Sequence, residues 1–250
     1  MFEACKKLNM DGIEYRLPLN IDKFLDEGGL EEFKKEKDIQ NIKIIDVGSS
    51  LLLNGRDEEK LPEFIKCLHI ANELNAAGIR VFLGDFIEKK GDKSDTDYNG
   101  LVKTLGKLCD MAEKENVEIW IETHNDFSTG KILRKLLDDV SKKNLKIIWD
   151  IMHPIEEDEA YPDTMKYLGD DIVHLHIKDG RQKDDKDLLD YLYTKLGEGE
   201  MPVKEIVKLC EECGYKGYYS LEWEPLWKKE IEGYDTMEIL EHYVSYMNEI

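Results

Sequence analysis

Short apolar segments alternate with longer amphipathic ones along the whole 250-residue chain. The short segments are rich in Ile, Val and aromatic residues and are bounded by Gly, Asp, Asn or Pro, which is typical of buried strands. We predict strands over Gly12–Leu17, Lys43–Val47, Arg80–Gly84, Val117–His124, Lys146–Ile151, Ile172–Lys178 and Tyr218–Glu224. Alternation of this kind produces β/α units and a parallel sheet.

The stretches between these segments have helical spacing. Between residues 61 and 78 the apolar positions fall on one helix face. We also expect helices over Ile132–Val140, after Pro202, which a first helical turn tolerates, and within Tyr234–Ile250. The polar stretch Glu88–Asn99 is predicted to be one long surface loop, which either covers a site or is inert.

Seven strands are too many for a small open sheet, and the length suits one α/β barrel. We therefore predict a (β/α) barrel that occupies residues 1–250 as a single domain. A doubly wound sheet is the alternative fold. It would normally bring a glycine-rich phosphate loop after its first strand, and the chain has neither GxGxxG nor GxxxxGK.

The chain is strongly acidic, with 35 basic and 55 acidic side chains and a formal net charge of −20. This charge argues against nucleic acid and against an anionic membrane surface, because both attract Lys and Arg. The sequence has no run of 18 apolar residues and no apolar N-terminal segment, so we expect neither a membrane span nor a signal peptide. Its five scattered cysteines indicate a reducing compartment, and we expect a cytoplasmic protein.

Two of the cysteines form a CxxC pair, Cys210 and Cys213. The pair continues the helical spacing of Val203, Ile206 and Val207, and the chain holds no second Cys pair to complete a zinc site. We interpret both as buried thiols on a helix face.

Polar residues stand where four consecutive predicted strands end, in the segments IETH, WDIMH, HLHIKD and SLEWEP. In a (β/α) barrel these ends form the active site. Because side chains alternate along a strand, each strand offers one set of residues of like orientation. The sets are Trp120, Glu122 and His124; Ile148, Asp150 and Met152; His174, His176 and Lys178; and Ser220, Glu222 and Glu224.

Three carboxylates cannot share a small cavity unpaired, since their repulsion and desolvation are large. A divalent cation removes this difficulty. Mixed carboxylate and imidazole ligation suits Mn²⁺, Mg²⁺, Co²⁺ or Zn²⁺, so we expect one divalent metal ion at this mouth.

At these residues the sequence resembles the xylose isomerase-like barrels, which include tagatose and psicose 3-epimerases, hydroxypyruvate isomerase, inosose dehydratase and the apurinic-site endonucleases. The matching elements are the Glu of IETH, the DxxH of DIMH, the HxKD of HIKD, the loop LGEGEMP and the strand GYYSLE. Upstream, LNMDGIEYR and GIRVFLG resemble the family's second and fourth strands. The resemblance spans nearly the whole chain and implies a TIM-type barrel.

The resemblance also implies roles for individual residues. The metal ligands would be Glu122, Asp150, His176 and Glu222, with Glu222 preferred to Glu224 because it stands five residues after Gly217. Substrate-binding residues would be His153, Lys178, His124, Arg181 and Trp227. His174 would lie deeper and is either a packed residue or part of the cavity.

The expected chemistry is metal-dependent isomerisation or epimerisation of a sugar or sugar phosphate through a cis-enediolate. A metal ion acidifies the C–H beside a ketose carbonyl, and Glu122 and Glu222 form the proton-transfer pair. The alternatives are a lyase of the inosose dehydratase type and a non-catalytic family member. A metal phosphodiesterase is disfavoured for two reasons. It would need about five histidines on several strands, and its nucleic-acid substrate has the same negative sign of charge as this chain. The expected partner is a small carbohydrate, and a homo-oligomer is possible.

The N-terminus departs from the family pattern, which opens with a strand, a helix and then the DGIE strand. Here residues 1–9 have the pattern of that helix, and DGIEY follows at once. We therefore predict seven strands, with the family's first strand missing. Either the true N-terminus is missing from the sequence or the barrel has a gap between the DGIEY and SLEWE strands. We expect a gap that is narrowed by shifted strands or covered by a partner chain or the C-terminal segment.

Overall fold

The computed structural model describes residues 2–250. Their contacts divide the chain into two compact units that interleave along the sequence. Unit 1 contains the residues up to Phe82, Thr96–Ile121 and Asp139–Lys146. Unit 2 contains Leu83–Asp95, Glu122–Asp138 and Ile147–Ile250. We describe each unit by itself.

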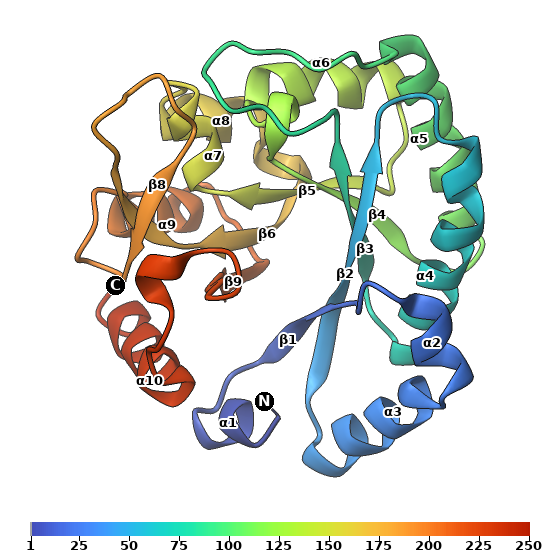
Figure 1. The fold of residues 1–250 in the computed structure, drawn as a ribbon, viewed down its shortest axis with the longest axis horizontal. Coiled ribbons are helices and arrows are strands. Elements are labelled where there is room, and N and C mark those ends of the chain that lie inside the picture. The colour runs from blue at the N-terminus through green and yellow to red at the C-terminus, as the bar shows by residue number, and fades with distance from the viewer. Residues whose placement is uncertain (1) are drawn as a thin grey trace. The chain divides into compact units, whose positions relative to one another are not determined.

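Unit 1 holds four strands, with helices before and between them. Helices α4 and α5 lie on the same side of β2–β4 (Figure 1), and their buried residues are apolar at helical spacing. A buried ion pair joins Arg80 of β3 to Glu14 of β1 at 3.0 Å. The elements are α1 (Phe2–Lys7), β1 (Gly12–Arg16), α2 (Ile21–Asp26), α3 (Gly29–Gln40), β2 (Lys43–Leu53), η1 (Glu58–Lys60), α4 (Leu61–Leu74), β3 (Gly78–Leu83), α5 (Tyr98–Glu113) and β4 (Glu118–Glu122).

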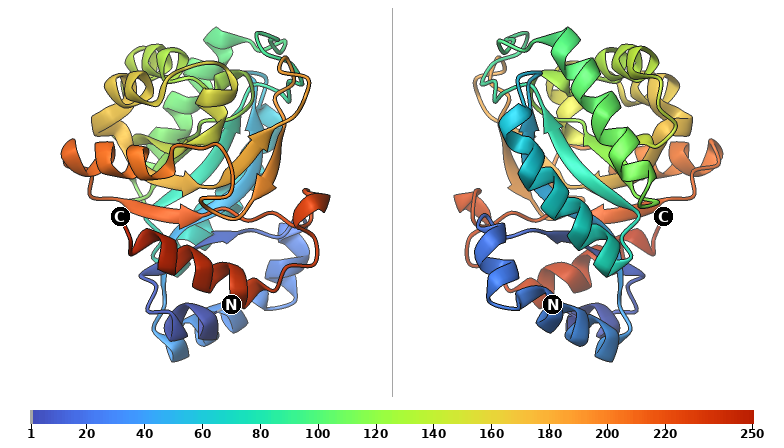
Figure 2. Two further views of the ribbon diagram at one scale, coloured as in Figure 1. Left: turned by 90° about the vertical axis from the view of Figure 1, so that its left-hand side faces the viewer. Right: turned by 90° about the vertical axis from the view of Figure 1, so that its right-hand side faces the viewer.

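Unit 2 holds most of the remaining elements, including an antiparallel hairpin. Strand β9 passes between α9 and α10 in Figure 2 (left): the Tyr219 hydroxyl donates to Glu211 of α9, and the Tyr219 carbonyl accepts from Tyr243 of α10. The elements are η2 (Asn125–Phe127), α6 (Gly130–Val140), β5 (Leu145–Asp150), α7 (Met152–Glu156), α8 (Tyr161–Leu168), η3 (Gly169–Asp171), β6 (Ile172–Ile177), β7 (Asp179–Gln182), β8 (Tyr191–Thr194), α9 (Val203–Glu212), β9 (Tyr218–Leu221), η4 (Lys229–Ile231) and α10 (Thr236–Met247).

Seven parallel strands follow one another in the order β1-β2-β3-β4-β5-β6-β9, with helices between them. This order confirms the predicted TIM-type (β/α) barrel with seven strands, and each of the seven lies where the sequence predicts it. Residues 2–7 form helix α1, as their sequence pattern predicts. Strands β1 and β9 are the two ends of the order. The predicted gap between them, and the single domain, stay predictions.

Three details differ from the sequence expectation. Strand β2 runs on to Leu53, because Gly48, Ser49 and Ser50 continue the extended backbone. The hairpin β7–β8 was not expected, since its strands are four residues long and partly polar. Cys210 is buried as predicted, but Cys213 is exposed, because α9 ends at Glu212.

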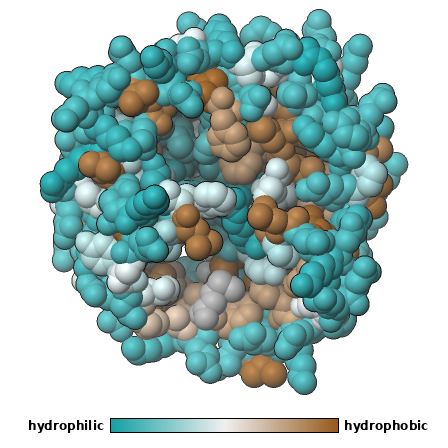
Figure 3. Space-filling model, in the orientation of Figure 1, coloured by the Kyte–Doolittle hydropathy of each residue, from teal (hydrophilic) through white to brown (hydrophobic). Residues whose placement is uncertain are grey.

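The face seen in Figure 3 is mostly hydrophilic, in keeping with a chain of which 36% is charged. Among residues 2–250, no helix combines the length and the apolar character that a membrane crossing needs.

Candidate metal centre

The carboxyl ends of β4, β5, β6 and β9 bring the predicted metal ligands together in unit 2. Thr123 joins two of these ends: its hydroxyl donates to the Asp150 carbonyl at 3.1 Å and accepts from the Asp150 N–H at 2.9 Å. The Glu222 N–H donates to the Ile177 carbonyl at 3.0 Å, which ties the end of β9 to β6. Regular backbone hydrogen bonding therefore sets the positions of the side chains.

Glu122, Asp150, His176 and Glu222 form one cluster, in which a ligand atom of each residue lies within 4.8 Å of the others. The Nδ1 atom of His176 is 3.7 Å from Glu122 Oε1 and 3.5 Å from Glu222 Oε2. Two donors at about 2.1 Å from one ion are at most about 4.2 Å apart, so small side-chain movements would close this cluster on a single cation. The donor set fits a divalent metal ion.

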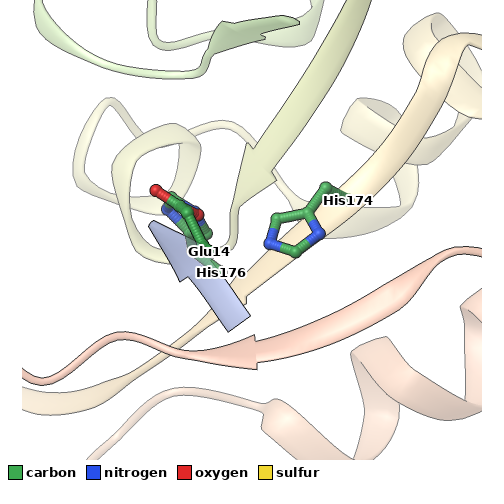
Figure 4. Close-up of side chains that lie close together, drawn as sticks. All are labelled: Glu14, His174 and His176. Carbon is green, nitrogen blue, oxygen red and sulfur yellow. The ribbon is translucent and has the colours of Figure 1, made fainter. Parts of the chain in front are cut away.

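His174 lies on the same strand as His176, two residues earlier (Figure 4). The two rings stand nearly perpendicular, with centroids 5.4 Å apart. His174 is buried and does not belong to the four-residue cluster, in agreement with its expected deeper position.

Lys178 reaches the same cluster from the end of β6. Its ammonium lies 2.5 Å from Asp150 Oδ2 and 3.0 Å from Glu222 Oε2, and it donates to His153 Nε2 at 3.3 Å. Only 2% of its side chain is exposed. A lysine this deep is stable as a cation only because carboxylates surround it.

The charges of the cluster shift one another's pKa values. Burial raises the pKa of Asp150 to about 7. Burial also acts to raise the pKa of Glu222, but Lys178 and His176 together hold it well below its usual range. Burial acts to lower the pKa of Lys178, yet Asp150 and Glu222 hold it well above the usual value.

His153 and His124 lie beside the cluster, with ring centroids 4.2 Å apart. The Nδ1–H of His153 donates to Glu156 at 2.7 Å, and that of His124 donates to the Asn125 side-chain oxygen at 2.6 Å. The Asn125 amide nitrogen donates to the Leu83 carbonyl, which fixes its orientation. In the neutral rings the lone pair is therefore on Nε2. Burial lowers the pKa of His124 to about 4, so this ring is neutral at physiological pH.

The loop after β3 carries an aromatic side chain to this pair of histidines. Phe86 meets the His124 ring edge-on, with centroids 6.0 Å apart, and 73% of Phe86 is exposed. Two backbone hydrogen bonds join the same loop to the hairpin connection: the Lys90 N–H donates to the Asp187 carbonyl, and the Leu189 N–H donates to the Glu88 carbonyl. Composition marked this loop as a possible cover, but nothing in the sequence identified Phe86.

The other two substrate-binding candidates, Arg181 and Trp227, lie outside the four-residue cluster. The Arg181 guanidinium donates to the Glu198 carbonyl at 3.0 and 2.7 Å and is exposed. Trp227 is 63% exposed and follows β9 in a turn. Sequence reasoning missed Glu156, although its position three residues after His153 on a helix places the two side chains on one face.

Comparison with known proteins gives a consistent relationship. A family model described as xylose isomerase-like TIM barrel matches residues 2–239. Hydroxypyruvate isomerase of Escherichia coli (strain K12) is 26% identical over 235 residues, covering 90% of this chain and 86% of the relative. Inosose dehydratase of Clostridium perfringens (strain 13 / Type A) is 21% identical and covers 78% and 74%. The crystal structure of an IOLI protein with a bound zinc atom shares the fold, with a TM-score of 0.82, 19% identity and coverage of 99% and 90%.

Proposed function

The chain belongs to the xylose isomerase-like TIM-barrel family, and from that premise we propose that it is a divalent-metal-dependent isomerase or epimerase of a sugar or sugar phosphate. The observation that carries the proposal is the convergence of Glu122 and Glu222 with Asp150 and His176 in one largely buried cluster. A structural ion pair needs only two ionisable side chains. A cluster of four, three of them carboxylates, is typical of a reaction centre.

Glu122, Asp150, His176 and Glu222 would hold the metal ion. When bound, the ion polarises the carbonyl and the adjacent hydroxyl of a ketose and acidifies the neighbouring C–H. Glu122 and Glu222 come from β4 and from the end of β9, with β5 and β6 between these strands in the sheet order. One of these carboxylates takes the proton from carbon, and the electron pair of the C–H bond forms the C=C bond of an enediolate. The other glutamate, in its protonated carboxylic acid form, gives its proton to the opposite face of the same carbon, which epimerises the carbon and leaves that glutamate ionised.

The remaining side chains bind and orient the substrate. The Nε2 lone pair of His124 accepts a hydrogen bond from a sugar hydroxyl, because its Nδ1–H is already engaged, and His153 lies beside it as a second substrate-binding side chain. Phe86 contacts the edge of the His124 ring from the loop side, where it can meet a bound substrate. Lys178 supplies a donor to a substrate oxygen.

A dehydration of the inosose type is the second candidate, favoured by the similarity to inosose dehydratase over 78% of the chain. It begins with the same proton abstraction and then expels a β-hydroxyl as water. A screen of ketoses, ketose phosphates and inososes with added Mn²⁺ separates the two reactions by their products.

The roles of the two glutamates are tested by exchange of the substrate C–H with solvent deuterium. Glu122→Gln and Glu222→Gln should each reduce exchange by on the order of 10²–10⁴-fold. Glu224→Gln is the matched control, since Glu224 lies two residues beyond Glu222 and outside the cluster, and it should retain exchange. Full activity of both cluster variants would refute the assignment.

A further inference from the structure

Lys178 has contacts that neither substrate binding nor proton transfer requires. Its ammonium lies between two carboxylates of the four-residue cluster, at 2.5 Å from Asp150 and 3.0 Å from Glu222. Both of those residues are metal ligands in the proposed function. A cation therefore already touches half of the donor set.

The Lys178 ammonium offsets the repulsion between buried carboxylates in the folded chain. Glu122, Asp150 and Glu222 are brought together by the backbone, and Asp150 is fully buried. Adjacent buried carboxylates destabilise a fold unless a positive charge lies beside them. The Lys178 ammonium supplies this positive charge to two of the three carboxylates.

We propose that Lys178 is a resident counter-ion of the cluster, and that a divalent metal ion binds by displacing its ammonium from Asp150 and Glu222. Metal binding is then an exchange of cations, and Lys178 lowers the affinity of the cluster for metal. The inference rests on the metal site of the proposed function.

The surroundings give the displaced side chain a place to go. A narrow cleft begins at Lys178 and Glu222 and is lined also by Tyr193, Trp223 and Tyr243. The Lys178 ammonium already lies 5.4 Å from the centre of the Tyr193 ring, whose face attracts cations. His153 Nε2 remains as a hydrogen-bond acceptor.

The test is Mn²⁺ affinity measured by titration calorimetry on metal-stripped protein. Lys178→Met keeps the apolar stem and removes the charge, so it should bind Mn²⁺ at least about tenfold more tightly than the unmodified chain, which is about 1.4 kcal/mol. Lys178→Gln removes the same charge with a polar side chain and should also bind more tightly. If Lys178→Met does not fold, the Lys178→Gln protein still tests the inference.

Lys228→Met is the matched control. Lys228 lies 4.5 Å from the centre of the same Tyr193 ring, but it pairs with Asp190 and the Tyr191 carbonyl rather than with the cluster. Its removal changes the net charge equally and should leave the Mn²⁺ affinity within about twofold, because its ammonium pairs with Asp190 and touches no ligand carboxylate of the cluster.

Thermal unfolding provides a readout that does not depend on activity. Without metal, the Lys178→Met protein should unfold at a lower temperature than the unmodified chain, since its carboxylates lack a counter-ion. With Mn²⁺ its midpoint should rise further than that of the unmodified chain, because stabilisation by a ligand grows with affinity.

The outcomes separate this inference from the proposed function. The inference is supported if both Lys178 variants bind Mn²⁺ more tightly than the unmodified chain. It is also supported if the variants bind Mn²⁺ and the unmodified chain does not. If the unmodified chain binds Mn²⁺ and neither variant binds more tightly, Lys178 is not a competing counter-ion, although the metal site stands. If no protein of the set binds Mn²⁺, the metal site and this inference both fail.

Discussion

Glu156 decides which nitrogen of His153 faces the cluster. The carboxylate accepts the Nδ1–H at 2.7 Å from the same short helix, α7, and is itself buried. Such a partner holds an imidazole in one tautomer and one orientation. Glu156 is therefore a positioning residue, which acts on the substrate only through His153.

We predict that Glu156→Ala raises KM about tenfold and changes kcat less, because the substrate-binding nitrogen loses its orientation. Glu156→Gln keeps an oxygen that accepts the Nδ1–H and should restore most of the affinity. Steady-state kinetics on both variants checks this. Equal KM values for Ala and Gln would contradict a role through the tautomer.

His124 makes stability depend on pH. Its pKa is about 4 in the folded chain, because burial disfavours the charged ring, against about 6.5 when unfolded. Between these values the unfolded chain binds a proton that the folded chain does not, so the free energy of unfolding falls as pH falls through this window.

We expect the drop in unfolding free energy from pH 7.5 to 5.0 to be about 1–2 kcal/mol smaller in His124→Gln than in the unmodified chain. Urea unfolding of metal-free protein at the two pH values measures it. An equal drop in both proteins would show that His124 is protonated in the folded state.

The sequence predicted the candidate ligands better than their partners. The residue sets that contain Glu122, Asp150, His176 and Glu222 follow from strand ends and side-chain alternation, and the choice of ligand within each set follows from the resemblance to the family. The bonds of Lys178 to Asp150 and Glu222 join side chains 28 and 44 residues apart. No local pattern specifies which of several lysines approaches a given carboxylate.

At the scale of elements, Asp179 ties the end of β6 to the loop before α9. Its Oδ1 accepts the N–H groups of Gly180 at 2.8 Å and Met201 at 3.0 Å, and its Oδ2 accepts those of Gly197 at 2.9 Å and Gly199 at 3.0 Å. Gly199 has no room for a side chain, since a Cβ there would lie 2.1 Å from Asp179 Oδ1. The loop therefore takes its shape from this carboxylate, which neighbours Lys178.

Asp179→Asn should destabilise the chain by on the order of 3 kcal/mol, because an amide nitrogen would replace one acceptor and leave buried N–H groups unsatisfied. Hydrogen exchange should increase over residues 195–201 in particular. Asp190→Asn, at a half-exposed ion pair, is the control and should cost less than about 1 kcal/mol. Unchanged exchange in the loop would contradict the assignment.

Elements were predictable where the pattern was long and apolar. The seven parallel strands and helices α4, α6 and α10 follow from apolar runs and helical spacing. The hairpin β7–β8 was not predicted, because its two strands are short and the connection between them, Lys183–Asp190, is charged. Its register depends on contacts such as the Tyr193 N–H to Glu230, which tertiary structure alone provides.

On the scale of the whole molecule, the net charge of −20 opposes compaction through self-repulsion. Exposed ion pairs such as Arg134–Asp138 offset little of this, since each contributes at most about 1 kcal/mol. We predict that raising NaCl from about 0.05 to 0.5 M raises the unfolding midpoint of the metal-free chain, because salt screens the repulsion. A falling midpoint would mean that attractive pairs dominate.

The fold class was predictable because alternation of strands and helices along the chain determines it. The relationship between β1 and β9 was not, since it depends on residues at opposite ends of the chain. The candidate metal ligands all come from the ends of β4, β5, β6 and β9, so none of them depends on the N-terminal strands.

The central claim is that one divalent metal ion binds at Glu122, Asp150, His176 and Glu222. A crystal structure of the chain grown with Mn²⁺, with anomalous diffraction data, tests it most directly. We predict one anomalous peak in unit 2, with an oxygen or nitrogen of each of the four residues about 2.0–2.3 Å from it. A cluster that carries no peak at saturating Mn²⁺, or a peak coordinated by other residues, would contradict it.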